Sequence, residues 1–207
     1  LTSVGHPHSS EQHLEWRLSF SIAERELVRS FEDTMMKVYI LLKMVKKTFI
    51  EPVLKDAFSS YHCKVCMLWM RETTPRELWS NENILYCLIL CIRQLYHWGT
   101  VGFCPDYFII TNNIYDRKII GAKQVDLVQS LRYLLSADCS FLLGIQCCNL
   151  GQLLANRISG MGIHYVSDVA LIAAEVNMDY FKETDFGYEI NIMSAFDCRC
   201  AIIQQIS

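Results

Sequence analysis

The longest uncharged apolar run in the sequence is the stretch Ile84–Ile92, which Arg93 ends. A helix needs about 20 apolar residues to cross a bilayer, so this run is too short for a membrane span. Apolar residues continue to Tyr96, and Gly99 then offers the residue type that most readily adopts left-handed geometry at a helix end. We therefore predict a central buried helix closed by Gly99, with a mainly α fold built around it.

The composition predicts one good-sized hydrophobic core. Of the 207 residues, 52% are apolar and 20% are charged, which favours one compact domain plus an appendage. The formal net charge is −3 and the isoelectric point is near 6.1. The chain as a whole therefore has no broad attraction for nucleic acid or for an anionic membrane, and any phosphate binding must be local.

The cysteines and the N-terminus indicate where the protein resides. Most of the ten cysteines lie inside apolar stretches, where a reduced cysteine behaves as a small hydrophobic residue. No segment at the start combines a basic region, an apolar stretch and a cleavage site, as a secretory signal would. We expect a cytoplasmic location, with the nucleus as the alternative. The chain opens at Leu1 without an initiator methionine, and we expect a fragment of a longer protein.

The chain divides into three predicted parts. Residues 1–14 read as a linker without hydrophobic periodicity, and no apolar frame fixes their histidines for metal binding. Trp16, Leu18 and Phe20 then alternate with polar residues, which is the pattern of a short strand with one buried face. We place a helical domain at residues 15–137 and leave residues 138–207 as an unassigned extension.

Capping residues predict the helix boundaries. Three helix starts are expected: at Ser21 with Glu24 as a capping box, at Ser59 or Ser60, and at Thr74 with Pro75. The first of these helices should run to about Ser30. Other expected elements are helices over 34–49 and 121–135, an extended loop over 106–115 packed on the helices, helical stretches over 152–158 and 167–177, and a strand over 188–192.

Several ordered phrases resemble the Mab-21-like family, which includes the cyclic GMP-AMP synthase-like nucleotidyltransferases. They are Trp16-Arg17-Leu18-Ser19-Phe20-Ser21, Leu41-Leu42-Lys43, Ser59-Ser60-Tyr61-His62-Cys63-Lys64 and Cys104-Pro105-Asp106-Tyr107-Phe108. Together they cover residues 15–137. The resemblance implies a two-lobed nucleotidyltransferase fold, of which this chain supplies the helical-bundle C-terminal lobe and lacks the N-terminal lobe.

The same resemblance implies nucleotide-binding residues and nucleoside triphosphates (ATP/GTP) as ligands. The residues that match the family's base-contacting and nucleotide-contacting positions are Arg17, Ser19, Ser21, Lys43, Ser60 and Tyr61. A guanidinium and two hydroxyls on one strand face can read a base edge, and a tyrosine can stack on a base for about 1–3 kcal/mol. A plainer interpretation stays open: Arg17 pairs with an acidic neighbour, the serines cap helices and Tyr61 belongs to the core.

The catalytic groups and the metal sites of such an enzyme are not found in the sequence. Nucleotidyl transfer needs carboxylates that converge on Mg²⁺ or Mn²⁺, and we expect that cofactor only together with the missing N-terminal lobe. Glu32 and Asp33 are adjacent and would diverge on a helix. The zinc-binding insertion of the DNA-sensing relative is absent, because residues 22–42 contain neither histidine nor cysteine. We therefore expect the chain alone to be inactive.

Three functions remain open. The leading hypothesis is the base-recognising lobe of a cyclic GMP-AMP synthase-like nucleotidyltransferase. The alternative is a non-catalytic Mab-21-like module that serves in interaction or developmental regulation. A third, less supported hypothesis is direct RNA or DNA binding through a lysine-bearing helix that carries Lys37, Lys43, Lys46 and Lys47, although such a face is usually just solvated.

Overall fold

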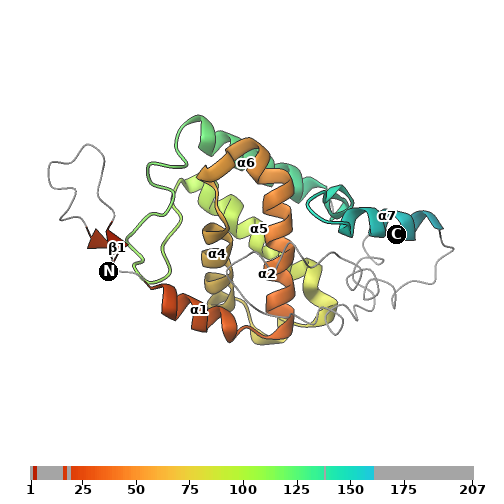
Figure 1. Cartoon of the computed structure of the whole chain (residues 1–207), viewed down its shortest axis with the longest axis horizontal. Helices are drawn as coiled ribbons and strands as arrows, with labels where there is room; N and C mark the ends of the chain where they lie inside the picture. The colour runs from red at the N-terminus through yellow and green to blue at the C-terminus, as the bar shows by residue number, and fades with distance from the viewer. Residues whose placement is uncertain (1, 4–15, 18–19, 138, 161–207) are drawn as a thin grey trace. The chain divides into compact units, whose positions relative to one another are not determined.

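The computed structural model of the chain describes residues 2–3, 16–17, 20–137 and 139–160. The chain divides into two compact units, Leu1–Phe31 and Glu32–Ser207. Helices dominate both units, which confirms the predicted mainly α fold (Figure 1). The predicted stretches over 167–177 and 188–192 lie outside the described residues.

The first unit holds a small strand pair and one helix. Strand β1, Thr2–Ser3, pairs antiparallel with β2, Trp16–Arg17, so the predicted strand exists but is only two residues long. Helix α1 spans Ser21–Arg29, close to the predicted range. The predicted capping box is wrong: the Phe20 carbonyl accepts the Glu24 N–H at 2.8 Å, so Phe20 is the N-cap and Ser21 is the first helical residue.

The second unit opens with a long, interrupted helical stretch. Its elements are α2 at Asp33–Val45, the π-helical turn η2 at Lys46–Ile50, α3 at Glu51–Leu54 and the 3₁₀ turn η3 at Lys55–Ala57. Pro52 is the second residue of α3. Because proline has no N–H to donate to the carbonyl four residues earlier, the preceding turn widens into π geometry.

Helix α5, Ile84–Val101, is the buried helix that the apolar run predicts. It packs against α2, against α4 at Ser60–Thr73 and against α6 at Ala122–Ser136. Its fully buried side chains recur at helical spacing and are Cys87, Leu88, Cys91, Ile92 and Leu95. Among the described residues, Asn81–Val101 is long and apolar enough to cross a membrane by length and composition, but half of it is buried inside the protein. That burial is typical of a core helix.

The end of α5 differs from the prediction. The helix continues through Gly99 and ends at Gly102, whose φ of 72° is the left-handed geometry expected at a helix C-terminus. Gly99 instead lies at the contact with α6. A methyl group placed on Gly99 would lie 3.2 Å from Val128 Cγ2, and the Gly99 carbonyl accepts a hydrogen bond from Gln124 Nε2 at 2.8 Å. Gly99 therefore serves a close helix–helix approach rather than a cap.

The predicted helix start at Thr74 and Pro75 is also wrong. Only the short 3₁₀ turns η4 at Arg76–Leu78 and η5 at Asn81–Asn83 follow α4 before α5 begins. Trp79 breaks the first turn with a ψ of 61°, and its side chain is buried. Burial of that indole therefore stops a helix that the local pattern favours.

Part of the predicted extension packs on the same unit. The 3₁₀ turn η6, Ser140–Gly144, precedes α7, Leu150–Gly160, which confirms the helix predicted over 152–158. Phe141 is buried and lies edge-to-face with Phe49, with ring centroids 6.2 Å apart. Residues 139–160 are thus attached to the region around η2.

Candidate functional site

The start of α4 is built from a capping arrangement. Ser59 is the N-cap, and its backbone N–H donates to His62 Nδ1 at 3.0 Å, which forms a capping box with histidine as the third helical residue. This confirms the predicted helix start. Ser60 is thereby the exposed first residue of the helix, and Tyr61 follows it, half-buried.

Tyr61 is tied to the loop that follows α5. Its hydroxyl donates to Asp106 Oδ2 at 3.0 Å. The other carboxylate oxygen, Oδ1, accepts the N–H groups of Phe108 and Ile109 at 2.9 and 3.2 Å. On the ring, Lys64 Nζ lies 5.8 Å from the centroid, within cation–π range. Tyr61 therefore has a fixed hydroxyl and a cation above its ring.

Two further contacts bind the loop to α4. Trp69 Nε1 donates to the Pro105 carbonyl at 3.1 Å, and the Tyr107 hydroxyl bonds to Glu72 Oε1 at 3.0 Å. Together with Tyr61, the α4 partners recur along one side of the helix. This confirms that the stretch after Pro105 is an irregular loop packed on the helices.

Asn113 organises the interior of the loop. Its Oδ1 accepts the backbone N–H groups of Cys104 and Tyr115 at 2.9 and 3.1 Å, while its Nδ2 donates to the Gly102 carbonyl at 2.9 Å. One side chain thus satisfies backbone groups that have no helix or sheet partner. The loop beside the start of α4 is consequently held in one conformation by its own hydrogen bonds.

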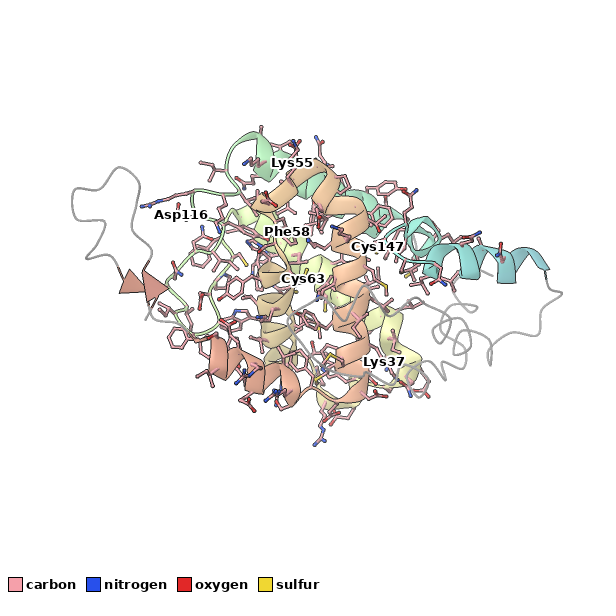
Figure 2. The ribbon with its side chains drawn as sticks, viewed as in Figure 1. Lys37, Lys55, Phe58, Cys63, Asp116 and Cys147 are labelled. Carbon is pink, nitrogen blue, oxygen red and sulfur yellow. The ribbon has the colours of Figure 1, made fainter. Side chains whose placement is uncertain are left out.

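His62, the residue after Tyr61, is buried. It is 2% exposed, its ring stacks on Phe58 at 4.7 Å, and it lies 5.5 Å from the Tyr115 ring (Figure 2 labels Phe58). Burial lowers the His62 pKa to about 4, although backbone groups of Ser59 and Ile114 oppose this shift. The imidazole is therefore neutral at pH 7, and it serves the helix start and the core rather than acid–base chemistry.

The lysines of the helical stretch are largely neutralised. Lys46 and Lys47 both bind the Glu51 carboxylate at 2.5 Å; partial burial opposes the shift, but these lysines lower the Glu51 pKa overall. Lys37 is 3% exposed and bonds to Asp33 and Asn81 at 2.9 and 2.6 Å (Figure 2). Lys37 consequently cannot belong to an exposed basic surface.

Lys43 lies on the same helical stretch and remains partly exposed. Its Nζ is 5.6 Å from the centroid of the buried Tyr39 ring. Burial raises the pKa of the Cys63 thiol to about 12, and the charges of Lys46 and Lys43 oppose this shift. The ammonium groups of Lys43 and Lys46 therefore act on the same part of α4, close to its start.

The six predicted site residues are placed to different degrees. Arg17 is in β2, Ser21 is the exposed first residue of α1, and Ser19 lies outside the described residues. Ser60 and Tyr61 are adjacent at the start of α4, and Lys43 lies in α2. The two groups belong to different compact units, so the assembly of one site from all six stays a prediction.

Asp106 is a site residue that sequence reasoning did not single out. Its signal was present, because it lies inside the phrase Cys104–Phe108 that carries part of the family resemblance. Its partner Tyr61 is 45 positions away, so no local spacing reveals the bond.

The cysteines of the helical core are buried thiols. Cys63, Cys66, Cys87 and Cys91 are fully buried, and desolvation raises the pKa of Cys87 to about 12. Within the described residues, no group of three or more His, Cys, Asp and Glu side chains is arranged to hold a metal ion. Cys63 and Cys66 lie three positions apart in α4, and Cys87 and Cys91 lie four apart in α5, so each pair shares a buried helix face.

Comparison with known proteins bears on this architecture. Residues 34–132 match the family model described as the Mab-21 protein HhH/H2TH-like domain. A cyclic GMP-AMP synthase-like receptor from Magallana gigas is 32% identical over 110 residues, which are 50% of this chain and 18% of that protein. The chain thus spans less than a fifth of the length of that relative. No solved structure matches the chain. The match over residues 34–132 and this relative together confirm the predicted resemblance to the Mab-21-like family.

Proposed function

We propose that this chain is the base-recognising C-terminal lobe of a cyclic GMP-AMP synthase-like nucleotidyltransferase. The observation that carries the proposal is the arrangement at the start of α4, where the half-buried Tyr61 is held by Asp106 beside the exposed Ser60. An aromatic ring with a fixed orientation loses little conformational freedom when a base stacks on it. The ligands are nucleoside triphosphates such as ATP and GTP.

Each polar group near Tyr61 has a role in this proposal. In this proposal the exposed Ser60 hydroxyl hydrogen-bonds a base edge or a sugar, and the ammonium group of Lys64 adds positive charge beside the Tyr61 ring. Lys43 approaches the polyphosphate. The family resemblance assigns Arg17, Ser19 and Ser21 to the second base, in a protein that also carries the N-terminal lobe. Mg²⁺ or Mn²⁺ enters with that lobe, and the chain alone binds nucleotide without turning it over.

The test is nucleotide binding to the 207-residue chain by isothermal titration calorimetry. We expect weak ATP or GTP binding, reduced roughly 5- to 150-fold by Tyr61→Ala, because a stacked base is worth about 1–3 kcal/mol. Tyr61→Phe keeps the aromatic ring, so its nucleotide affinity should decrease much less. Tyr107→Ala is the matched control, since it removes another half-buried tyrosine that the same loop and α4 share.

The outcomes separate the candidate functions. Equal nucleotide binding by the wild type and Tyr61→Ala would assign Tyr61 to the core and remove the support for base recognition. Absence of nucleotide binding would favour the non-catalytic interaction module. Binding of a labelled duplex at low salt, with a loss in Lys43→Ala, would favour the nucleic-acid hypothesis instead.

A further inference from the structure

Cys147 and Cys148 are adjacent thiols in the loop between η6 and α7. Both are partly exposed. The other cysteines of the described residues are Cys139, which is also partly exposed, and Cys63, Cys66, Cys87, Cys91 and Cys104, which are buried. A reagent in solution can therefore reach this pair without unfolding the helical core.

The pair rests against the end of α2 and the turn η2, as Figure 2 shows for Cys147. The Cys147 sulfur lies 3.8 Å from the Met44 carbonyl oxygen, and the Cys148 sulfur lies 3.9 Å from the Met44 sulfur. The Thr48 hydroxyl oxygen accepts the N–H of Gln146 at 3.4 Å, which leaves the hydroxyl proton to be donated to Cys147. Groups far apart in sequence thus surround the two sulfur atoms.

These surroundings favour one thiolate. A hydrogen bond from Cys148 lowers the Cys147 pKa to about 6; burial opposes this shift, while the Thr48 hydroxyl, the backbone and the Lys47 charge assist it. The same bond and burial raise the pKa of Cys148, so the pair loses a single proton near neutral pH. Cys147 is then the nucleophile, and Cys148 remains a thiol beside it.

We propose that Cys147 and Cys148 form a redox-reactive modification site, at which a hydroperoxide such as hydrogen peroxide oxidises the two thiols to a disulfide. The Cys147 thiolate attacks one peroxide oxygen, the O–O bond breaks, and the leaving hydroxide takes a proton to become water. The Cys148 sulfur then displaces the hydroxyl group from the Cys147 sulfenic acid, and a second water leaves. Two thiols and one hydrogen peroxide give one disulfide and two waters.

The disulfide between Cys147 and Cys148 should be readily reduced back to the two thiols. Adjacent Cα atoms are about 3.8 Å apart, whereas disulfides usually join Cα atoms about 4.4–6.8 Å apart. The bond is therefore strained and easily reduced by cellular thiols. Because both sulfur atoms contact Met44 in the reduced state, oxidation also changes how the loop before α7 rests on α2.

The test is peroxide treatment of the full 207-residue chain followed by tryptic mass spectrometry. Cleavage after Arg132 and Arg157 yields one peptide, 133–157, that contains Cys139, Cys147 and Cys148. We expect this peptide to lose two hydrogens, with the bond between Cys147 and Cys148, and to regain them after reduction. Cys148→Ser should stop at a Cys147 sulfenic acid that dimedone traps. Cys139→Ser is the matched control and should behave as the wild type.

A second measurement does not depend on disulfide formation. Alkylation of Cys147 by iodoacetamide should be half-maximal near pH 6 and roughly tenfold faster than that of Cys139 at pH 7. Thr48→Val, which leaves both cysteines in place, should move that midpoint upward. The proposal is overturned if Cys147 reacts no faster than Cys139, or if the main disulfide involves Cys139.

Discussion

The Tyr61 hydroxyl donates a hydrogen bond of 3.0 Å to Oδ2 of Asp106, and this bond joins the start of α4 to the loop after α5. Asp106 is 8% exposed, and its other oxygen accepts the backbone N–H groups of Phe108 and Ile109. A nearly buried carboxylate needs such donors, because an unpaired buried charge is strongly destabilising. The same three donors therefore stabilise the loop and orient the tyrosine ring.

Replacing Tyr61 with phenylalanine should lower the free energy of unfolding by about 1–2 kcal/mol. The change removes one hydrogen bond to a charged acceptor and leaves Asp106 with its two backbone donors. The measurement is urea denaturation followed by circular dichroism at constant pH. A two-state transition with an unchanged m-value indicates that the loss is local.

Tyr107→Phe is the matched control for this loss. The Tyr107 hydroxyl also bonds to a carboxylate at 3.0 Å, but its partner Glu72 is exposed. Water can replace that bond, so the expected loss is below about 1 kcal/mol. Equal losses in the two variants would mean that burial of Asp106 adds nothing to the Tyr61 bond.

Local sequence signals predict most of the helical frame. The apolar run beginning at Ile84 and the serine cap before Tyr61 each act within one or two helical turns, so the sequence alone reveals them. The helix end was not predictable in this way. Gly99 and Gly102 are both acceptable stops, and the contact of α6 with Gly99 lets the helix continue to Gly102.

The candidate site is predictable only where single residues carry the signal. Ser60 and Tyr61 are consecutive residues of one phrase of the sequence, so their common position at the start of α4 follows from the local helix signal alone. The bond from Tyr61 to Asp106 joins residues 45 positions apart, and it depends on how the loop folds back. Lys37 has the sequence context of a solvated lysine but is buried, and its ammonium group donates a hydrogen bond to Oδ1 of Asn81, 44 positions away.

Stability should depend on pH through His62. Its pKa is about 4 in the folded protein and about 6.5 in the unfolded chain, so the unfolded chain binds more protons between these values. The free energy of unfolding is therefore highest above about pH 6.5, and it decreases as the pH falls toward 4. The shift corresponds to about 3 kcal/mol, which urea titrations at a series of pH values can measure.

His62→Gln provides the control for the pH effect. Glutamine at this position can still accept the Ser59 N–H, as in the common capping box, but it does not titrate. The variant loses the stacking on Phe58 and should be less stable at pH 7. Its deficit relative to the wild type should shrink between pH 6.5 and pH 4. A deficit that stays constant across this range would contradict the assignment to His62.

Lys55→Gly should stabilise the protein by about 0.5–1 kcal/mol. Lys55 is exposed, and it has a φ of 51° and a ψ of −132°, a backbone geometry that disfavours side chains with a Cβ. Glycine relieves this strain, although it also adds freedom to the unfolded chain. Gln129→Gly, an exposed position inside α6, is the control and should cost about 1 kcal/mol. In both thermal and urea unfolding, Lys55→Gly should raise the midpoint and Gln129→Gly should lower it.

Gly151→Ala should loosen the attachment of α7. A methyl group at this position would lie 2.5 Å from the Leu143 carbonyl oxygen and 2.7 Å from that of Ile145, and both are backbone atoms that cannot rotate away. We expect a loss of about 2 kcal/mol or more and faster amide exchange in α7 than in α5. Gly144→Ala is the control, because its nearest neighbour is the edge of the Phe49 ring at 3.2 Å, a side chain that can shift. Unchanged exchange in α7 of Gly151→Ala would show that this helix does not need the close backbone approach.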